Sequence, residues 1–338
     1  MKFAITGGGT GGHLAIAKAL QEALVIRGHE AIFIGSTAGQ DRSWFGDKSG
    51  FSKSYFLETT GVVNRRGLAK IAALFRVLKA MFNARKLLKA HKIQAVISVG
   101  GFSAAPTSLA TIFSTIPLYI HEQNAVEGRL NRLLKPYAKA FFSSYDESAP
   151  VKDYPVNATL FKTARVRSKV KTVIFLGGSQ GAKAINDLAL SIAPFCHSKH
   201  IKIIHQCGVN DYERIKESYK ALGIGVHLFA FSNDLPKLMQ EADLAITRSG
   251  ASTLWEVCAN ALPAFFVPYP YAAGDHQFYN ARFIVQKELG WCEREDEDLE
   301  AFLKPILDED LSEKSTKLKA LSHEGGAQEI IKYVESEL

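Results

Sequence analysis

The sequence predicts an α/β protein built from two doubly wound, Rossmann-like domains. Strand-like and helix-like segments alternate through the first half of the chain, as they do in a doubly wound sheet. A strand, a glycine-rich loop and a helix open the chain, and the same order returns from residue 172. With 338 residues, the chain is longer than one hydrophobic core usually serves. We therefore expect two similar domains whose glycine loops could face each other across a cleft.

The first glycine loop is the most informative stretch. Residues 2–5 are expected to form a strand, and an apolar pattern with helical spacing begins at Leu14. The glycines at 7–12 tolerate positive φ and let a ligand approach the backbone. The helix start behind them carries roughly half a positive elementary charge and free N–H groups, so the loop suits a phosphate. His13 adds a titratable side chain where the loop becomes the helix.

Two other nucleotide-binding classes fit this loop poorly. Gly7-x-Gly9-x-x-Gly12 matches the dinucleotide pattern, which usually has an acidic residue at the end of the second strand. This chain has Gly35-Ser36 there, so NAD is disfavoured. Neither glycine loop contains the GxxxxGK[ST] pattern of a P-loop NTPase.

The remaining elements are expected in order along the chain. Polar or glycine residues follow several strands, at the edge where open α/β sheets bind ligands. We place a linker at 145–171, a first domain at 1–155, a second at 165–325, and a C-terminal helix at 327–338 that packs back on the first domain. The further strands are predicted over residues 30–34, 95–99, 117–120, 172–176, 201–205, 226–229, 244–247 and 264–268.

A basic amphipathic helix is expected between Leu68 and Lys89. Its apolar residues have helical spacing and are surrounded by Lys and Arg. Such a helix can dock on an anionic membrane surface. It can equally turn Phe75 and its neighbours toward the core, and from these residues alone the core interpretation is favoured.

Composition limits the possible partners. The chain is 47% hydrophobic and 22% charged, as in ordinary soluble proteins. No apolar run approaches the roughly 18 residues of a spanning helix, and no signal pattern opens the chain, so we expect a cytosolic protein. The net charge of +7 favours anionic partners, whether nucleic acid, acidic lipid or phosphorylated substrate. The scattered cysteines and the lack of an acidic cluster predict neither a disulfide framework nor a metal site. These cysteines are Cys196, Cys207, Cys258 and Cys292.

Three segments of the second half carry polar residues that could either bind a ligand or serve only as a turn or helix cap. In the second glycine loop, Ser179 and the following N–H groups suit a pyrophosphate, although a plain tight turn is possible. Thr253-x-x-Glu256 is a capping-box pattern, but a carboxylate there could also accept from both hydroxyls of a ribose. Gln277 could bind sugar hydroxyls, whereas the neighbouring Asp275 or His276 could act only as a helix cap.

Six motifs follow one another along the chain. They are Gly8-Gly9-Thr10-Gly11-Gly12-His13, Gly100-Gly101-Phe102-Ser103, His121-Glu122-Gln123-Asn124, Gly177-Gly178-Ser179-Gln180-Gly181-Ala182, Arg248-Ser249-Gly250-Ala251 and His276-Gln277-x-x-Asn280. In these motifs and their order the chain resembles the MurG family of glycosyltransferases as far as about Asn280. The resemblance implies a GT-B fold and an inverting, metal-independent transfer of N-acetylglucosamine from its UDP donor to the C4 hydroxyl of lipid I, which gives lipid II. No cofactor is implied.

The resemblance also implies site residues. Ser179 would meet the diphosphate, Glu256 the ribose, and Gln277 the sugar, with the uracil near Phe231-Ser232. The acceptor's pyrophosphate would lie on Gly8 and Gly9, beside Phe102. The full set implied for UDP-N-acetylglucosamine is Thr10, Gly11, Gly12, Asn124, Ser179, Gln180, Gly181, Ser232, Arg248, Glu256 and Gln277.

The resemblance reverses the preference for residues 68–89, which would meet the membrane that carries the lipid acceptor. It implies a peripheral protein on the cytoplasmic face of the bacterial inner membrane, possible contacts with cell-wall synthesis and division proteins, and no nucleic-acid partner. Two rivals stay open. One is another two-domain UDP-sugar enzyme such as a UDP-N-acetylglucosamine 2-epimerase, and the other is a non-catalytic nucleotide-binding membrane module.

Inverting transfer needs a base on the acceptor hydroxyl. His13 is the first candidate, because imidazole titrates near neutrality, and Glu122 is the second. Alternatively, His13 could be a positioning residue that donates a hydrogen bond to phosphate or sugar and takes no proton. The chain departs from the family at three places. His13 runs straight into Leu14 where members have several residues including a Pro-Gly pair, Asn157 replaces a linker arginine, and Phe102 replaces a common tyrosine.

Overall fold

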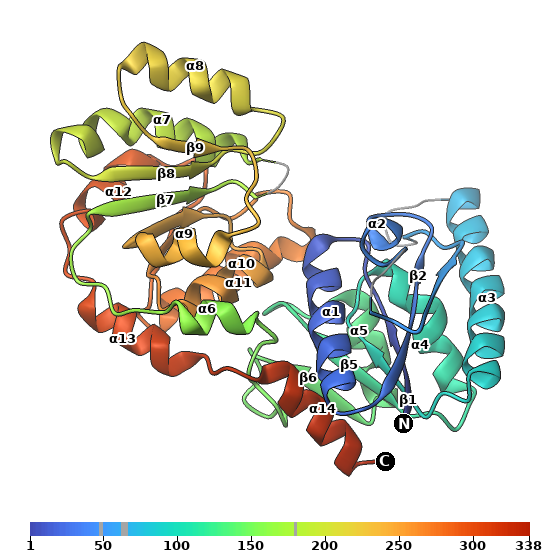
Figure 1. Cartoon of the computed structure of the whole chain (residues 1–338). Helices are drawn as coiled ribbons and strands as arrows, with labels where there is room; N and C mark the ends of the chain where they lie inside the picture. Colours follow the sequence, from blue (N-terminus) through green and yellow to red (C-terminus); the bar gives the residue numbers. More distant parts are fainter. Residues whose placement is uncertain (47–49, 62–66, 179–180) are drawn as a thin grey trace. The chain divides into compact units, whose positions relative to one another are not determined.

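The chain forms two compact α/β units in a computed structural model that describes residues 1–46, 50–61, 67–178 and 181–338 (Figure 1). Unit 1 comprises Met1–Val156 together with Gly325–Leu338, and unit 2 comprises Asn157–Glu324. The chain therefore passes from unit 1 into unit 2 and back again.

Unit 1 is built on a parallel sheet of six strands in the order β3-β2-β1-β4-β5-β6. Its central strands are continuous apolar runs because helices cover both faces of the sheet. The chain order reverses between β1 and β4, which is the point where doubly wound sheets bind ligands. The strands are β1 (Lys2–Thr6), β2 (Glu30–Ser36), β3 (Lys53–Leu57), β4 (Ala95–Ser98), β5 (Leu118–Glu122) and β6 (Ala140–Ser143).

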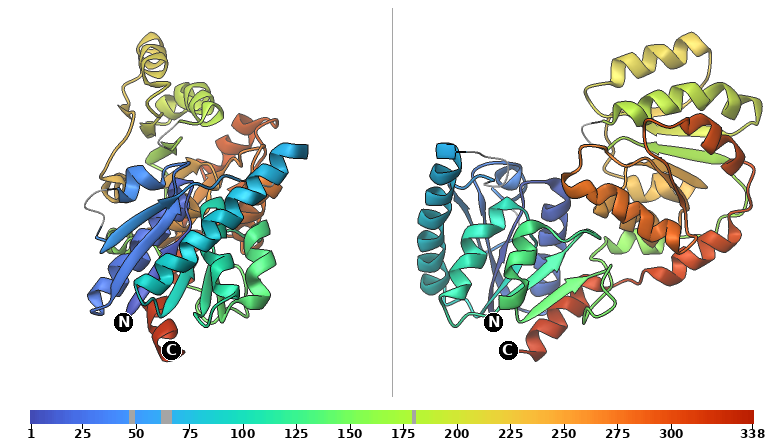
Figure 2. Two further views of the ribbon diagram at one scale, coloured as in Figure 1. Left: turned by 90° about the vertical axis from the view of Figure 1, so that its right-hand side faces the viewer. Right: turned by 180° about the vertical axis from the view of Figure 1, so that it is seen from behind.

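The helices of unit 1 form two layers. Helices α1 and α14 pack together on one face of the sheet, and α3 and α4 pack together on the other (Figure 2). The guanidinium of Arg27, just after α1, donates to Glu335 of α14 at 2.7 Å. The helices are α1 (Gly11–Ile26), α2 (Asp41–Phe45), α3 (Gly67–Ala90), α4 (Ala105–Ile112), α5 (Arg129–Leu134) and α14 (Gly326–Ser336), with 3-10 turns η1 (Phe102–Ala104) and η2 (Lys135–Tyr137).

Unit 2 repeats the architecture with the strand order β12-β11-β10-β7-β8-β9 and a reversal between β7 and β10. Its strands are β7 (Thr172–Leu176), β8 (Lys202–Gln206), β9 (His227–Phe229), β10 (Leu244–Thr247), β11 (Ala264–Phe266) and β12 (Trp291–Cys292). Its helices are α6 (Ala158–Lys162), α7 (Lys183–Ser198), α8 (Tyr212–Leu222), α9 (Leu235–Glu241), α10 (Ala251–Ala259), α11 (His276–Gln286), α12 (Leu299–Ile306) and α13 (Ser312–Leu321), with the 3-10 turn η3 (Ala273–Asp275).

All the strands expected from the sequence are present, with ends that differ by at most two residues. Strands β3, β6 and β12 were not expected, and each lies at an edge of its sheet. The segment expected to be a linker contains the short helix α6. Asn157 caps it, since its side-chain oxygen accepts from the backbone N–H of Thr159 at 2.9 Å.

A buried arginine anchors the segment that follows α6. The side chain of Arg167 is 1% exposed, and its guanidinium donates to backbone carbonyls of Arg165, Met239, Ala242 and Asn260. Burial lowers its pKa to about 9, so it keeps its charge at neutral pH. These bonds fix the entry of the chain into unit 2 against the ends of α9 and α10.

Within the described parts of the chain, no helix combines the length and apolar character that crossing a membrane requires.

Candidate functional site

The glycine loop of unit 1 lies at the reversal between β1 and β4, and two of its amides already have partners. The N–H of Gly8 donates to the carbonyl of Gly100 at 3.1 Å. The N–H of Gly9 donates to Asp41 Oδ1 at 2.5 Å, and Asp41 Oδ2 accepts from the N–H of Ser36 at 2.8 Å. The side chain of Asp41 is fully buried. The loop is thus held by a carboxylate from α2, which the sequence did not reveal.

The contact between the two loops of unit 1 requires glycine. Gly101 has φ 79°, and a side chain there would collide with the carbonyl of Gly8. A side chain at Gly9 would meet the ring of Phe102, 2.5 Å away. The loop after β1 therefore packs on η1, with the ring of Phe102 beside Gly9.

His13 lies in the first turn of α1, which begins at Gly11 and not at Leu14 as expected. Thr10 occupies the N-cap position, and its hydroxyl does not bond a backbone N–H of the helix. Its Oγ1 lies instead 2.8 Å from Nδ1 of His13 and orients the imidazole. The first N–H groups of a helix have no partner within the helix, so Gly11 and Gly12 present donors beside this ring.

Glu122, the alternative base, is buried at the end of β5. Its Oε1 accepts from the N–H of Asn124 at 3.0 Å. Its Oε2 accepts from the N–H of Gly128 and from Nδ2 of Asn131, both at 2.8 Å. The carboxylate therefore holds the loop between β5 and α5. This loop includes Asn124, which is expected to bind UDP-N-acetylglucosamine.

The neighbouring His121 is also buried. Burial, and to a smaller extent the nearby His13, lower its pKa to about 3. His121 is consequently neutral at physiological pH.

The second glycine loop lies at the reversal between β7 and β10 of unit 2. Ser179 and Gln180, expected to bind the diphosphate, lie outside the described residues. Gly181 has φ 82°, and its N–H donates to the carbonyl of Gly178 at 3.1 Å. Helix α7 then begins at Lys183, so its first N–H groups follow the loop directly.

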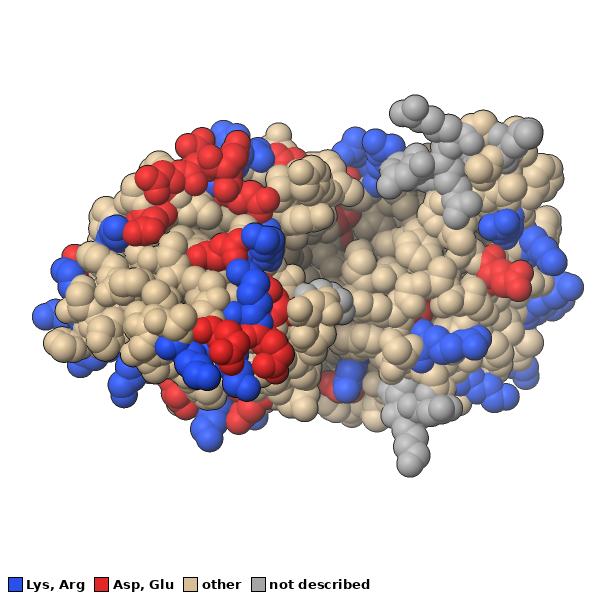
Figure 3. Space-filling model, turned by 90° about the horizontal axis from the view of Figure 1, so that it is seen from above, with Lys and Arg blue, Asp and Glu red and all other residues tan. Residues whose placement is uncertain are grey.

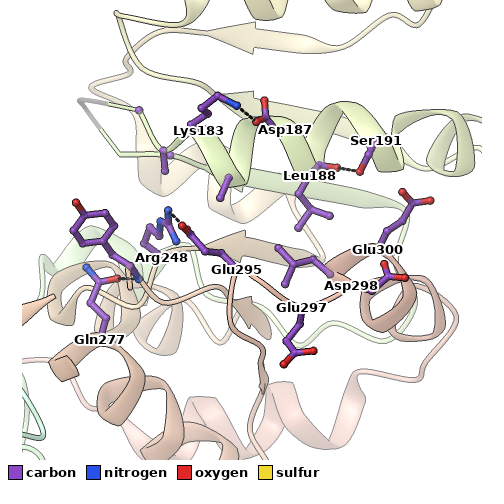
Figure 4. Close-up of a pocket in the computed structure, with 16 residues that line it drawn as sticks. Lys183, Asp187, Leu188, Ser191, Arg248, Gln277, Glu295, Glu297, Asp298 and Glu300 are labelled. Atoms are coloured by element: carbon purple, nitrogen blue, oxygen red, sulfur yellow. Dashed lines mark hydrogen bonds and ion pairs between the residues drawn. The ribbon is translucent and has the colours of Figure 1, made fainter. Parts of the chain in front are cut away.

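A cavity of about 850 Å³ opens next to this loop (Figure 4). It is lined by residues of α7 between Lys183 and Ser191, by Arg248 and Gln277, and by Glu295 and residues 297–300. Oε1 of Gln277 accepts from the N–H of Tyr269 at 3.0 Å. Among the described residues no partner is seen for Nε2 of Gln277, which remains able to donate to a ligand.

Arg248, which is expected to bind the UDP-sugar, uses its guanidinium to bind the protein itself. Nη1 donates to the carbonyls of Val267 at 3.1 Å and Pro268 at 3.0 Å. Nη2 lies 2.7 Å from Glu295 in an ion pair (Figure 4). This side chain braces the loop after β11.

Glu256 does not form the capping box that the sequence allowed. Helix α10 begins at Ala251 with Gly250 at the cap, which places Thr253 and Glu256 inside the helix. In the described structure the carboxylate has no hydrogen-bond partner, and burial raises its pKa to about 7. Such a carboxylate is available to accept from ligand hydroxyls. The other cap alternative, His276, is likewise not a cap, and Asp275 holds that position without a side-chain bond.

Ser232 lies in the loop between β9 and α9. Its Oγ accepts from the N–H of Asp234 at 3.0 Å, which shapes the turn into α9. The preceding Phe231 is 55% exposed. The ring of Phe231 is therefore exposed, and the expectation that uracil binds near Phe231-Ser232 stays a prediction.

The four cysteines are free thiols, and Cys196, Cys207 and Cys258 are buried. In the parts of the chain that the structure describes, no three His, Cys, Asp or Glu side chains are arranged to hold a metal ion.

Helix α3 turns an apolar strip away from the core. Its buried side includes Ala73, Met81 and Leu88. Phe75 is 68% exposed and Phe82 is 57% exposed, so the interpretation that they face the core is wrong. Lys and Arg side chains gather on the side of unit 1 where α3 lies (Figure 3). The exposed apolar residues of this strip are Ile71, Leu74, Phe75, Leu78 and Phe82.

Comparisons with known proteins match both halves of the chain to one family of glycosyltransferases. The model of the glycosyltransferase family 28 N-terminal domain matches residues 3–143, and that of the C-terminal domain matches residues 172–334. The chain is 60% identical to the UDP-N-acetylglucosamine--N-acetylmuramyl-(pentapeptide) pyrophosphoryl-undecaprenol N-acetylglucosamine transferase of Sulfurimonas denitrificans, covering 98% of this chain and 97% of the relative. It is 57% identical to the transferase of the same name from Wolinella succinogenes, covering 99% of each.

Solved structures agree with the fold. The crystal structure of Acinetobacter baumannii MurG matches with a TM-score of 0.81 and 28% identity over 99% of each chain. A UDP-GlcNAc 2-epimerase from Neisseria meningitidis matches with a TM-score of 0.64 but only 15% identity, which shows a shared fold alone. On this evidence the chain has a GT-B fold and belongs to the MurG family within glycosyltransferase family 28.

Proposed function

We propose that the protein transfers N-acetylglucosamine from UDP-N-acetylglucosamine to the C4 hydroxyl of lipid I, the undecaprenyl-pyrophosphoryl-N-acetylmuramyl-pentapeptide, to form lipid II. The observation that carries this proposal is 60% identity, over nearly the full length of both chains, to a transferase of that name. The transfer is inverting and needs no metal ion.

The donor binds to unit 2 in this proposal. The carboxylate of Glu256 accepts from the ribose hydroxyls, and its lack of a protein partner supports this role. Nε2 of Gln277 donates to a sugar hydroxyl, since its Oε1 is already bound by Tyr269. The diphosphate lies at the start of α7, with Ser179, Gln180 and Gly181. There the helix N-terminus stabilises the negative charge on the leaving UDP.

His13 acts as the base. It removes the proton of the acceptor C4 hydroxyl while that oxygen forms a bond to C1 of N-acetylglucosamine, and the bond from C1 to the diphosphate oxygen breaks. UDP leaves with the electron pair of that bond. The contact with Thr10 Oγ1 supports this choice because it holds the imidazole in one orientation. Glu122 is less suited, since three protein donors already occupy its oxygens.

The acceptor's pyrophosphate binds beside Phe102 in this proposal. The N–H groups of Gly8 and Gly9 have protein partners, so the donors that remain for it are those at the start of α1, from Gly11 onward. Gly8 and Gly9 then shape the loop through their backbone.

The apolar strip of α3 docks on the anionic membrane that carries the acceptor, with the surrounding Lys and Arg near the lipid headgroups. We thus infer a peripheral protein on the cytoplasmic face of the bacterial inner membrane.

The proposal is tested by incubating the purified protein with radiolabelled UDP-N-acetylglucosamine and lipid I, with and without EDTA. Label should move into the lipid fraction at similar rates in both. Absence of labelled lipid contradicts the proposal. In that case, epimerised UDP-sugar formed without acceptor would indicate a 2-epimerase, and donor binding without turnover would indicate a non-catalytic module.

A further inference from the structure

The loop after β12 forms ion pairs with two separate segments of the donor site. Arg294 Nη2 donates to Asp275 Oδ2 at 2.6 Å, at the start of α11. The next residue, Glu295, pairs with Arg248 at 2.7 Å. Two consecutive residues of opposite charge thus connect one loop to both motifs that precede α10 and α11. Neither Arg294 nor Glu295 is among the residues proposed above to bind the UDP-sugar.

The backbone before α11 has an unusual conformation that needs support. Gly274 and Asp275 are both left-handed, with φ 64° and 55° respectively. A single left-handed aspartate is tolerated but unfavourable, and glycine is the usual residue there. Asp275 has no capping bond to α11 that would favour this conformation. Its backbone N–H donates to the carbonyl of Ala272 at 2.8 Å, and its side chain pairs with Arg294, whose guanidinium also stacks 4.1 Å from the ring centre of Phe278.

The second ion pair supports the other end of the same segment. Arg248 is bonded to the carbonyls of Val267 and Pro268, and its guanidinium lies over the ring of Tyr269. The N–H of Tyr269 in turn holds the amide oxygen of Gln277 at 3.0 Å. Both ends of residues 268–277 are therefore attached, through arginines, to the loop after β12.

We propose that the Arg294–Asp275 and Glu295–Arg248 ion pairs are a positioning brace that fixes the Gln277 amide for the sugar of the donor. Asp275, Arg294 and Glu295 are positioning residues, because they act through the backbone of residues 268–277. The inference rests on the proposed function, in which Gln277 meets the sugar and Glu256 the nucleotide. It predicts that the brace affects recognition of the sugar and leaves recognition of UDP unchanged.

The test compares calorimetric affinities for UDP and for UDP-N-acetylglucosamine in the full chain. Asp275→Asn keeps the size of the side chain and its tolerance of left-handed φ but removes the charge. Loss of one well-placed sugar hydrogen bond predicts that affinity for the UDP-sugar falls about tenfold while affinity for UDP changes less than about twofold. Arg294→Gln should have the same effect, and Arg294→Lys should recover part of the lost affinity. Asp308→Asn makes the same charge change as Asp275→Asn in an exposed ion pair with Lys199, outside residues 268–296, and serves as the matched control.

An unchanged ratio of the two affinities in Asp275→Asn and Arg294→Gln overturns the proposal, and so does an equal loss for both ligands. If Asp275→Asn does not fold, the ratio measured for Arg294→Gln decides. Failure of the proposed function is distinguishable, because it appears as absence of transfer by the unmodified protein.

Discussion

The two candidate bases, His13 and Glu122, differ in their hydrogen-bond partners. Nδ1 of the imidazole lies 2.8 Å from Thr10 Oγ1, and the ring lies in the first turn of a helix. The carboxylate accepts from three donors of its own loop. A base must have a lone pair directed at the substrate, so these contacts favour the histidine.

His13→Ala should therefore lower kcat on the order of 10²-fold or more, with the donor KM little changed. The reason is that the base acts on the acceptor hydroxyl and not on UDP. Steady-state rates with lipid I measure the effect. His227→Ala, which changes an exposed histidine of unit 2, is the control. A full rate in His13→Ala would remove the imidazole from the chemistry.

Glu256 predicts a pH dependence of donor binding. Its pKa rises from 4.5 in the unfolded chain to about 7 in the folded one, so folding favours the protonated form. Its contribution to stability is complete below pH 4.5 and is lost as the pH rises through 7. Ribose hydroxyls need the ionised form as acceptor, so affinity for UDP-N-acetylglucosamine should increase from pH 6 to pH 8.

Calorimetry across that pH range measures the increase. In Glu256→Gln the affinity should be lower and nearly independent of pH. The same variant should be more stable than the unmodified protein at pH 8, by roughly 1 to 3 kcal/mol, and equally stable near pH 4.5. An identical pH slope in both proteins would exclude Glu256 as the titrating group.

At the scale of elements, α3 shows why the helical spacing of apolar residues alone gave the wrong orientation of the helix. Two apolar strips run along this helix. One includes Ala73, Met81 and Leu88 and is buried, and the other, which includes Phe75 and Phe82, faces outward. The helical spacing of the large residues favoured the core interpretation, although Phe75 and Phe82 lie on the exposed strip. Helical periodicity identifies a face but does not say what covers it.

Phe75→Glu combined with Phe82→Glu should abolish flotation with anionic liposomes and leave the circular dichroism spectrum unchanged, because both rings are exposed. Liposomes without anionic lipid should bind the unmodified protein more weakly. Val209→Glu combined with Leu222→Glu changes two exposed apolar residues of unit 2 and should leave flotation intact. Undiminished flotation of the α3 variant would exclude this strip as the docking face.

At the scale of the whole molecule, the sequence predicted the central strands and missed three edge strands. Central strands such as β4 and β10 are buried on both faces, which leaves continuous apolar runs in the sequence. The edge strand β3 includes Lys53 and Ser54, and β12 has only two residues, so neither shows such a run.

The candidate site, too, was predictable from the sequence only in part. Glycine loops at the strand ends were predictable because their chemistry is local. The contact of Asp41 with Gly9, and that of Arg294 with Asp275, join residues far apart in the chain. Such contacts depend on how the elements pack, and no spacing rule encodes them.

The return of α14 to unit 1 has a consequence for synthesis on the ribosome. Unit 2 is continuous in sequence, so it can fold as soon as residues 157–324 have emerged. Unit 1 waits for α14, because the partner of α1 and the Glu335 that pairs with Arg27 are made only after the whole of unit 2. The half that carries His13 is thus begun first and completed last, and nascent chains pass through a stage in which the apolar face of α1 is uncovered.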